Sequence, residues 1–547
     1  MKAKTIIVLA TLLAFGQGAW AQTSSFPETD DEKGTEAKPF LIENIEDLNA
    51  LASDVNSGTD YSGKHFKLTA DLTFTAPVSP ETSNFTPIGK VEYRDDNETP
   101  LYEEKAFKGV FDGGGKTISG IVVNTSDAEA VGLFGNVFYP GIIKNVKMTN
   151  CSFTGNYCVG AICGECNGGS AGEHKDVQWG IFDCEVGSNV TVTAATSGEG
   201  EDALPGWYAG GIVGDLKVSR ATGCISAATV SGAEYVGGIA GSISHDKDAA
   251  GSPYGSLTDC FYTGNSVTAT ENKYAGTIVG LNGSVDDDDN LTDGTAGKLV
   301  FTLLDNDSEA AINNATRLSN YDDLEANVTL SGRTLYKDNS WNTICLPFAM
   351  TAEQVTAQLA PTKLMTLSTA TFDDGTLTLN FADATEIEAG KPYIIKWTGN
   401  TEWGNPTFTG VTVSSAAPTD VTGTAANFHG IYAPYSTGGE NKSMLYLGAN
   451  NKLYYPNAAM TINAFRAYFT LNGIEAGPAS SSAPAAVRAF VLNFGDGDGT
   501  TGILSLSADS KDSKDNAAWY DMQGRRLSGK PTASGIYINN GNKIVIK

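Results

Sequence analysis

A short glycine-containing pattern occurs five times between residues 131 and 280, and it limits the folds open to this chain more than any other feature. Each copy has a small or apolar residue, a glycine, further apolar residues and a second glycine, and the copies lie about 27 to 50 residues apart. A unit this small cannot bury its own apolar face, so such units stack and share one core. The pattern therefore predicts a solenoid. Its glycines are Gly132, Gly135, Gly160, Gly164, Gly210, Gly214, Gly237, Gly241, Gly276 and Gly280.

The residues around these glycines indicate the kind of solenoid. Glycine permits tight corners and close approach of two backbones. The Ile, Val and Phe side chains between the glycines suit the interior of stacked strands about 4.8 Å apart. Short apolar runs bounded by Gly, Asn, Asp and Ser predict strands along the whole chain. We predict an all-β protein in which residues 38–300 form a β-solenoid, in its simplest form a parallel β-helix.

A series of cysteines accompanies the repeats. Cys151, Cys184, Cys224 and Cys260 each precede a glycine copy by a short strand-like stretch. We interpret them as small buried residues stacked in phase with the repeats. A disulfide between neighbouring coils is the alternative, because Cα separations near 5 Å permit one.

Three further cysteines lie together within one repeat. Cys158, Cys163 and Cys166 include a pair separated by two residues, a spacing found in metal sites. A structural zinc site needs four ligands, and no second pair stands at a matching distance. We therefore predict no metal site and no cofactor; a local disulfide is the alternative to a repeat that is simply rich in cysteine.

One helix is predicted ahead of the repeats. Ile45, Leu48, Leu51, Ala52 and Val55 recur at helical spacing. Asn44 is placed to cap the start of this helix and Gly58 to end it. A solenoid needs its ends covered, so we predict an N-terminal capping helix; a partner-binding helix is the alternative.

The pattern changes near residue 300. Residues 301–334 have no glycine repeat and are predicted to be a transition segment. Residues 335–504 contain alternating strands with more Trp, Tyr and Pro, which favours an antiparallel β-sandwich. A polar linker is predicted over residues 505–518 and a short C-terminal β tail over residues 519–547.

Two segments resemble known families. Residues 39–283 resemble GLUG-repeat proteins, through the copies Val131–Gly135 and Val236–Gly241 and the lead-in Phe107–Ser119. That repeat occurs in large surface proteins of Bacteroidetes and as a non-catalytic region of IgA-specific metallopeptidases. The tail, with Trp519–Leu527, Gly535–Ile538 and Lys543–Lys547, is similar to C-terminal sorting domains of type IX secretion. The first resemblance implies a surface repeat protein and the second implies export.

The N-terminus and the charge point to the same compartment. Residues 1–21 have a basic start, an apolar run and a small-residue site, so we predict a signal peptide cleaved after Ala21. Residues 22–37 are predicted to lack regular structure, and the mature chain to lack a membrane span. The net charge of −27 argues against nucleic acid as a partner. We expect a secreted or cell-surface protein.

No catalytic motif is apparent. The zinc-peptidase pattern His-Glu-x-x-His has no counterpart around His65, His174, His245 or His429. Paired carboxylates of the kind that cleave polysaccharides are not singled out by any pattern. The acidic runs Asp286–Asn290 and Gly495–Gly499 do not fit the twelve-residue calcium loop, and we interpret them as solvated loops. We predict no catalytic residues.

Three functions stay open at this point. The sequence favours a non-catalytic surface protein, an adhesin, that binds an extracellular glycan or protein. A structural component of the cell surface is the second candidate, and a β-helix polysaccharide lyase or hydrolase is the third.

Overall fold

The computed structural model divides the chain into two compact units. The first comprises Met1–Ser256 and Tyr262–Gly297, and the second comprises Leu257–Phe261 and Lys298–Lys547. The structure describes residues 25–26, 33–79, 82–95, 100–125, 128–168, 179–198, 203–244, 255–283, 298–448, 451–477, 486–495, 500–505, 507–508, 519–520, 535–539 and 542–546. The predicted signal peptide and most of the predicted linker lie outside these ranges.

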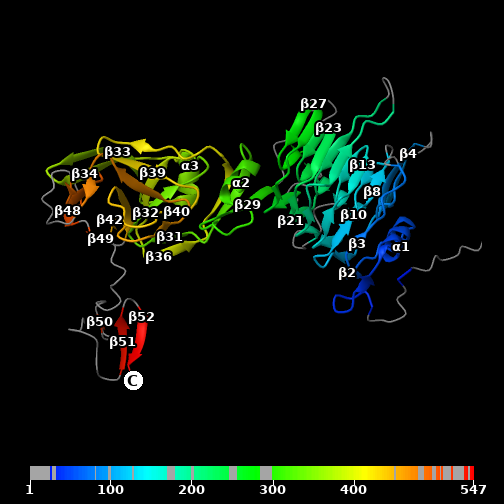
Figure 1. The fold of residues 1–547 in the computed structure, drawn as a ribbon, viewed down its shortest axis with the longest axis horizontal. Coiled ribbons are helices and arrows are strands. Elements are labelled where there is room, and N and C mark those ends of the chain that lie inside the picture. The colour runs from blue at the N-terminus through cyan, green and yellow to red at the C-terminus, as the bar shows by residue number, and fades with distance from the viewer. Residues whose placement is uncertain are drawn as a thin grey trace, which may run out of the picture. The chain divides into compact units, whose positions relative to one another are not determined.

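The first unit is a parallel β-helix (Figure 1). One coil contains β11 (Ile142–Lys144), β12 (Lys147–Thr149), β13 (Ser152–Gly155), β14 (Cys158–Gly160) and β15 (Cys163–Asn167), after which β16 (Gly180–Phe182) begins the next coil beside β11. Each strand pairs in parallel with its counterparts in the neighbouring coils. The predicted fold class is confirmed for this half of the chain.

Most of the remaining strands of the first unit fall into the same stacks, whereas β4 (Lys90–Asp95) and β5 (Pro100–Lys105) form an antiparallel pair of their own. The β11 stack also contains β1 (Phe40–Ile42), β2 (His65–Leu68), β6 (Val110–Asp112) and β21 (Arg220–Thr222), and the β12 stack contains β3 (Leu72–Thr73), β7 (Thr117–Ser119), β17 (Glu185–Val186) and β22 (Ile225–Ser226). The β13 and β14 stacks contain β8 (Val122–Asn124), β18 (Thr191–Ala194), β9 (Ala130–Val131) and β19 (Trp207–Gly210), and the long strands β23 (Thr229–Gly237) and β27 (Val267–Gly276) run through both. The β15 stack contains β10 (Phe134–Phe138), β20 (Val213–Lys217), β24 (Ala240–Ser244) and β28 (Val279–Asn282).

The core of the β-helix follows from alternation within very short strands. In a three-residue strand, only the middle side chain points inward. Phe111, Ile143, Ile181 and Ala221 occupy this position in successive coils, are in register, and are fully buried. The interior is therefore a set of apolar ladders that run from coil to coil.

The predicted helix is confirmed as α1 (Ile45–Asn56). The Asn44 side chain accepts a hydrogen bond from the Asp47 backbone N–H at 2.9 Å, and Leu48, Leu51, Ala52 and Val55 are buried. At the other end, the Asn56 side chain donates to the Pro87 carbonyl and accepts from the Gly89 N–H. These contacts tie the helix to the first coils, as expected of a cap.

The second unit contains a two-layer β-sandwich. One layer consists of β32 (Trp341–Cys345), β35 (Pro392–Lys396), β33 (Lys363–Asp373), β34 (Thr376–Asp383), β47 (Ala489–Asn493) and β48 (Thr500–Ser505). The other consists of β38 (Val421–Thr422), β39 (Ala426–Gly430), β44 (Ala467–Leu471), β41 (Met444–Gly448), β42 (Lys452–Tyr455) and β49 (Ser507–Ala508). Buried side chains from both layers, among them Leu379, Phe381, Phe428 and Phe469, form one apolar core.

The sandwich is antiparallel except at two places, where β34 pairs with β47 and β42 pairs with β49 in parallel. The predicted transition segment, residues 301–334, is placed in this unit and includes most of β29 (Lys298–Leu304), α2 (Asn314–Asn320) and β30 (Glu325–Ser331). The antiparallel partner of β30 is β37 (Thr407–Thr412). Near the C-terminus, β50 (Trp519–Tyr520), β51 (Gly535–Asn539) and β52 (Asn542–Ile546) form an antiparallel sheet.

Candidate functional site

The first glycines of the repeat are stacked in register. Gly160, Gly210, Gly237 and Gly276 are paired in successive coils, and Gly132 follows Val131, the partner of Val159. A Cβ atom at Gly210 would lie 1.9 Å from the carbonyl oxygen of Val213. At this corner the chain turns too tightly for any side chain.

The second glycines serve a different purpose. A Cβ atom at Gly164 would lie 2.5 Å from the backbone nitrogen of Val131, and one at Gly214 would lie 2.4 Å from that of Val159. The equivalent atoms at Gly135, Gly241 and Gly280 would also meet backbone atoms within 2.4 Å. The β15 stack therefore packs backbone to backbone against the β14 stack, with no room for a core between them. These ten glycines position the walls of the β-helix and bear no chemistry.

One member of the cysteine series, Cys151, must be corrected. Cys184 and Cys224 are equivalent, because their following residues Glu185 and Ile225 are paired, and Val146 occupies the same position one coil earlier. Cys151 lies at the next corner instead, where it is equivalent to Val190. Cys260 directly precedes β26 (Phe261–Tyr262), the next strand of the β12 stack after β22, and so takes the same position as Cys224 one coil later. Because the inserts between strands vary in length, spacing along the sequence assigned Cys151 to the wrong corner of the coil.

All eight cysteines are buried free thiols. Burial is the main cause that raises the pKa of Cys158, Cys163 and Cys184 well above the ordinary thiol value. Such thiols stay protonated at neutral pH and are poor nucleophiles and metal ligands. Within the described ranges, no three His, Cys, Asp or Glu side chains gather as a metal site would require.

A pocket opens on the outer side of the β14 stack. Its volume is about 250 Å³, and its lining combines aromatic and apolar groups with one amide and one carboxylate. The lining residues are Glu129, Asn156, Tyr157, Leu204, Pro205 and Trp207. We call it the aromatic pocket. A concave site with an apolar wall and a few polar groups is typical of small-ligand binding.

Asn156 holds one wall of this pocket in place. Its side-chain N–H donates to the Ala195 carbonyl oxygen at 2.9 Å and lies 3.3 Å from the carbonyl oxygens of Leu204 and Pro205. Ser197 and Leu204 exchange two backbone hydrogen bonds that close the base of this loop between β18 and β19. The Leu204 side chain, 62% exposed, is thereby fixed at the rim.

Aromatic rings continue from the pocket along the stack. The Tyr157 ring lies 5.6 Å from that of Trp207 and 5.1 Å from that of Tyr208. Tyr208, Tyr235 and Tyr274 then stack on one another in successive coils, each 5.1 Å from the next. These three tyrosines share a positive φ of 54 to 57°, which is unfavourable for a bulky residue. The sequence signal for this row is an aromatic residue one or two places before four of the glycine copies, and the repeat analysis did not use it.

Burial raises the pKa of Tyr157 and of Tyr208 far above the ordinary tyrosine value. Both hydroxyls therefore remain protonated across the physiological range and can donate hydrogen bonds. The Trp207 indole N–H is also buried, and it has no hydrogen-bond partner among the described residues.

A second polar arrangement lies in the sandwich. His429 Nδ1 is 2.7 Å from a carboxylate oxygen of Asp420, and its Nε2 contacts the Thr470 hydroxyl. The order of acid, imidazole and hydroxyl is that of a hydrolase triad. However, β44, which carries Thr470, is paired on both sides, so its backbone N–H groups are engaged in the sheet and offer no oxyanion hole. Asp420 and Thr470 thus give both ring nitrogens of His429 a partner.

The other singled-out residues contribute no site. His65 lies on β2, and burial is the main cause that lowers its pKa. His174, His245 and the run Asp286–Asn290 lie outside the described residues, as does most of Gly495–Gly499. Among the residues that the structure covers, no helix has the length and apolar character needed to cross a bilayer.

Comparisons with known proteins give partial matches. No family model matches the chain. Halomucin from Haloquadratum walsbyi is 36% identical over 138 residues, which is 25% of this chain and 1% of halomucin. A protein named as a candidate Gly-rich membrane protein, from Evansella cellulosilytica, is 29% identical over 117 residues, 21% of this chain and 12% of that protein. The matches thus span only a small part of both relatives.

One solved structure was also found. It is the crystal structure of a candidate immunoglobulin A1 protease from Bacteroides ovatus, which is 22% identical and is matched over 50% of this chain and 66% of its own. Its TM-score of 0.29 is too low to relate the two folds.

Proposed function

We propose that this chain is an exported surface protein that binds a saccharide without cleaving it, and that the aromatic pocket is the binding site. The observation that carries the proposal is the pairing of Tyr157 and Trp207 beside Asn156 and Glu129 in one pocket of the β-helix. The apolar face of a sugar ring stacks on aromatic rings, while amide and carboxylate groups bond its hydroxyls.

The indole N–H of Trp207, which has no hydrogen-bond partner within the described part of the chain, supports this proposal. A buried donor without a partner costs about 1 to 3 kcal/mol. A phenylalanine would offer a smaller aromatic face without that cost, so an aromatic contact alone does not require a tryptophan there. A binding surface that needs a large, rigid aromatic face would explain it.

Surface location is the other part of the proposal. The N-terminal signal, the resemblance to GLUG-repeat proteins and the sorting-like tail all favour export. A relative that is named as a membrane protein matches part of the chain, which is compatible with this location. We propose that the β-helix displays the pocket outside the cell, as an adhesin would.

The test is binding of residues 22–547 to an array of neutral saccharides and mucins, with product analysis of the same samples. Trp207→Ala should weaken binding of the best neutral ligand by at least about ten-fold, because an aromatic anchor contributes about 2 kcal/mol or more. Trp403→Ala, at a partly exposed tryptophan of the second unit, is the matched control and should have no effect.

Binding that survives in Trp207→Ala would exclude the aromatic pocket as the site. A cleaved product would contradict the non-catalytic function. If no saccharide binds at all, the proposal is wrong.

A further inference from the structure

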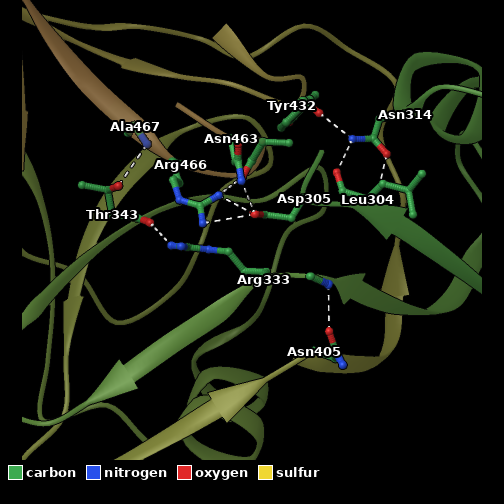
Figure 2. Close-up of polar contacts among 12 residues, drawn as sticks. Leu304, Asp305, Asn314, Arg333, Thr343, Asn405, Tyr432, Asn463, Arg466 and Ala467 are labelled. Carbon is green, nitrogen blue, oxygen red and sulfur yellow. Dashed lines mark hydrogen bonds and ion pairs between the residues drawn. The ribbon is translucent and has the colours of Figure 1, made fainter. Parts of the chain in front are cut away.

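A cluster of charged and polar side chains lies inside the second unit (Figure 2). Asp305 directly follows β29 and is 6% exposed. Its carboxylate accepts a hydrogen bond from Asn463 at 2.7 Å and two from the guanidinium of Arg466. The Asn314 side chain accepts a hydrogen bond from the Leu304 N–H and donates one to the Leu304 carbonyl oxygen, each at 2.8 Å. These two bonds fix the backbone beside Asp305.

A second arginine belongs to the same cluster. Arg333, at the end of the turn after β30, is 5% exposed and donates to the Thr343 carbonyl oxygen at 2.8 Å. Its Nε–H is buried and has no hydrogen-bond partner among the described residues. Burial is the main cause that lowers the pKa of Arg333, to about 9, and the charge of Arg466 lowers it further. Arg333 is still charged at neutral pH.

The arginines of the cluster outnumber the carboxylate that they face. Two guanidinium groups, Arg333 and Arg466, face the carboxylate of Asp305, whereas the other buried carboxylate nearby, that of Asp307, accepts the backbone N–H of Asn314 at 2.6 Å. Arg466 uses its two Nη groups on Asp305 and Ala464. Neither Asp305 nor Ala464 bonds the Nε–H of Arg466, and a quarter of this side chain is exposed. A buried excess of positive charge is costly unless an anion compensates it.

A cavity of about 270 Å³ adjoins this cluster. Thr343, Thr461, Asn463 and Arg466 line its polar side, and Tyr446 and Met460 belong to its apolar side. No Asp or Glu is among the lining residues. In a chain with a net charge of −27, a cavity whose lining has an arginine and no acid favours an anionic ligand. This cavity and the aromatic pocket both lie just below the volume of about 300 Å³ at which pockets for drug-sized ligands start, so each suits one small group.

We propose that this cavity binds the carboxylate or sulfate group of a small acidic molecule, such as an acidic monosaccharide. Guanidinium groups bind such oxyanions in a planar, two-pronged arrangement. Because Asp305 already engages both Nη groups of Arg466, the anion would meet this guanidinium on its Nε side, and the threonine hydroxyl and Asn463 amide would add neutral hydrogen bonds. The proposal does not depend on the aromatic pocket, because the two sites lie in different units of the chain.

The test is calorimetric titration of residues 22–547 with glucuronate, galactose 6-sulfate, and neutral glucose and galactose. We expect saturable binding of at least one acidic sugar and no binding of the neutral ones. The carboxylate and sulfate probes distinguish the two sources of the anionic group. Equal binding of neutral and acidic sugars, or no binding of either acidic sugar, would overturn the proposal.

Two variants locate the site. Thr461 is exposed at the cavity, so Thr461→Trp should fill it and weaken binding at least about ten-fold without touching the charged cluster. Thr412→Trp, at another exposed strand threonine, is the matched control and should bind normally. Arg466→Lys, which keeps the charge but loses the fork, should also weaken binding.

If Arg466→Lys does not fold, Thr461→Trp still decides the matter. Full affinity in Thr461→Trp would place the anion elsewhere and refute the site. Trp207→Ala should leave binding of the acidic sugar unchanged, so failure at the aromatic pocket and failure at this cavity give different results.

Discussion

Gly210 shows how one residue position restricts the β-helix. A Cβ atom there would lie 1.9 Å from a carbonyl oxygen of its own turn, and 2.6 Å from the backbone nitrogen of Gly241 in the next coil. Neither contact can be relieved by rotating a side chain, because both partners are backbone atoms. The corner must open, and the ladders on both sides of it must shift.

We therefore expect Gly210→Ala to lower the free energy of unfolding of the β-helix by more than about 3 kcal/mol. Chemical denaturation followed by tryptophan fluorescence measures this. Gly187→Ala is the matched control in the same unit, since the nearest atom to its Cβ would be 3.2 Å away and belongs to the Asn189 side chain. A loss of stability equal to that of the control would mean that the corner is not tight.

The buried thiols make a second prediction at this scale. Burial is the main cause that raises the pKa of Cys151 from 9.0 to about 11, and it raises the pKa of Cys158, Cys163 and Cys184 as well. The folded chain therefore keeps protons that the unfolded chain releases above pH 9. Because the folded state then binds more protons, its stability falls as the pH rises.

These thiols should leave the free energy of unfolding unchanged below about pH 8 and lower it progressively above about pH 9. Denaturant titrations across this range measure the slope. Cys184→Val removes one thiol from the interior and should make the slope shallower. A β-helix whose stability rises between about pH 9 and pH 11 would contradict the assignment of these thiols as protonated.

At the scale of elements, α1 depends on a single side chain at its start. The Asn44 side chain accepts the Asp47 N–H, which would otherwise lack a partner. The helix packs its apolar side on the first coils and covers core that a coil stack leaves open at its end. Capping of the helix and capping of the β-helix are therefore connected.

We expect Asn44→Ala to destabilise the β-helix by about 1 kcal/mol, the usual cost of a lost N-cap. Asn44→Asp should retain nearly full stability, because aspartate caps equally well and suits the helix dipole. Thermal unfolding of the three proteins side by side provides the measurement. An alanine variant as stable as the parent would show that this bond contributes nothing.

At the scale of the whole molecule, charge is the dominant property. The chain has 63 acidic and 36 basic side chains, giving a net charge of −27. Self-repulsion of like charges opposes the compact state, and salt screens it. The few ion pairs on the surface contribute little against this, since exposed pairs are worth about 0 to 1 kcal/mol.

The melting temperature should therefore rise when sodium chloride is increased from about 10 mM to about 300 mM at neutral pH. An uncharged solute at the same osmolarity serves as the control and should give a smaller rise. A melting temperature that falls with salt would indicate that attractive pairs outweigh the net repulsion. Differential scanning calorimetry distinguishes these outcomes.

The sequence by itself determined the features that repeat locally. Five copies of the glycine pattern predicted a β-solenoid, and periodic apolar residues predicted α1 with its cap at Asn44. Both predictions were confirmed. The glycine pattern could be recognised because each coil of a β-helix stacks on the next coil along the chain, and the helix could be recognised because its turns are only a few residues apart. The glycines could be found, but their two distinct purposes depend on which backbone lies opposite each one.

Only the tertiary structure decided which side chains come together. Cys151 was wrongly placed in phase with Cys184, since inserts of unequal length hide the corner to which each residue belongs. The aromatic pocket combines Tyr157 with Trp207, one coil and a long loop later. In the second unit, 161 residues separate Asp305 from Arg466. Sequence patterns reach across a few residues of one strand or helix, whereas such sites form where distant segments pack, and the lengths of loops set that packing.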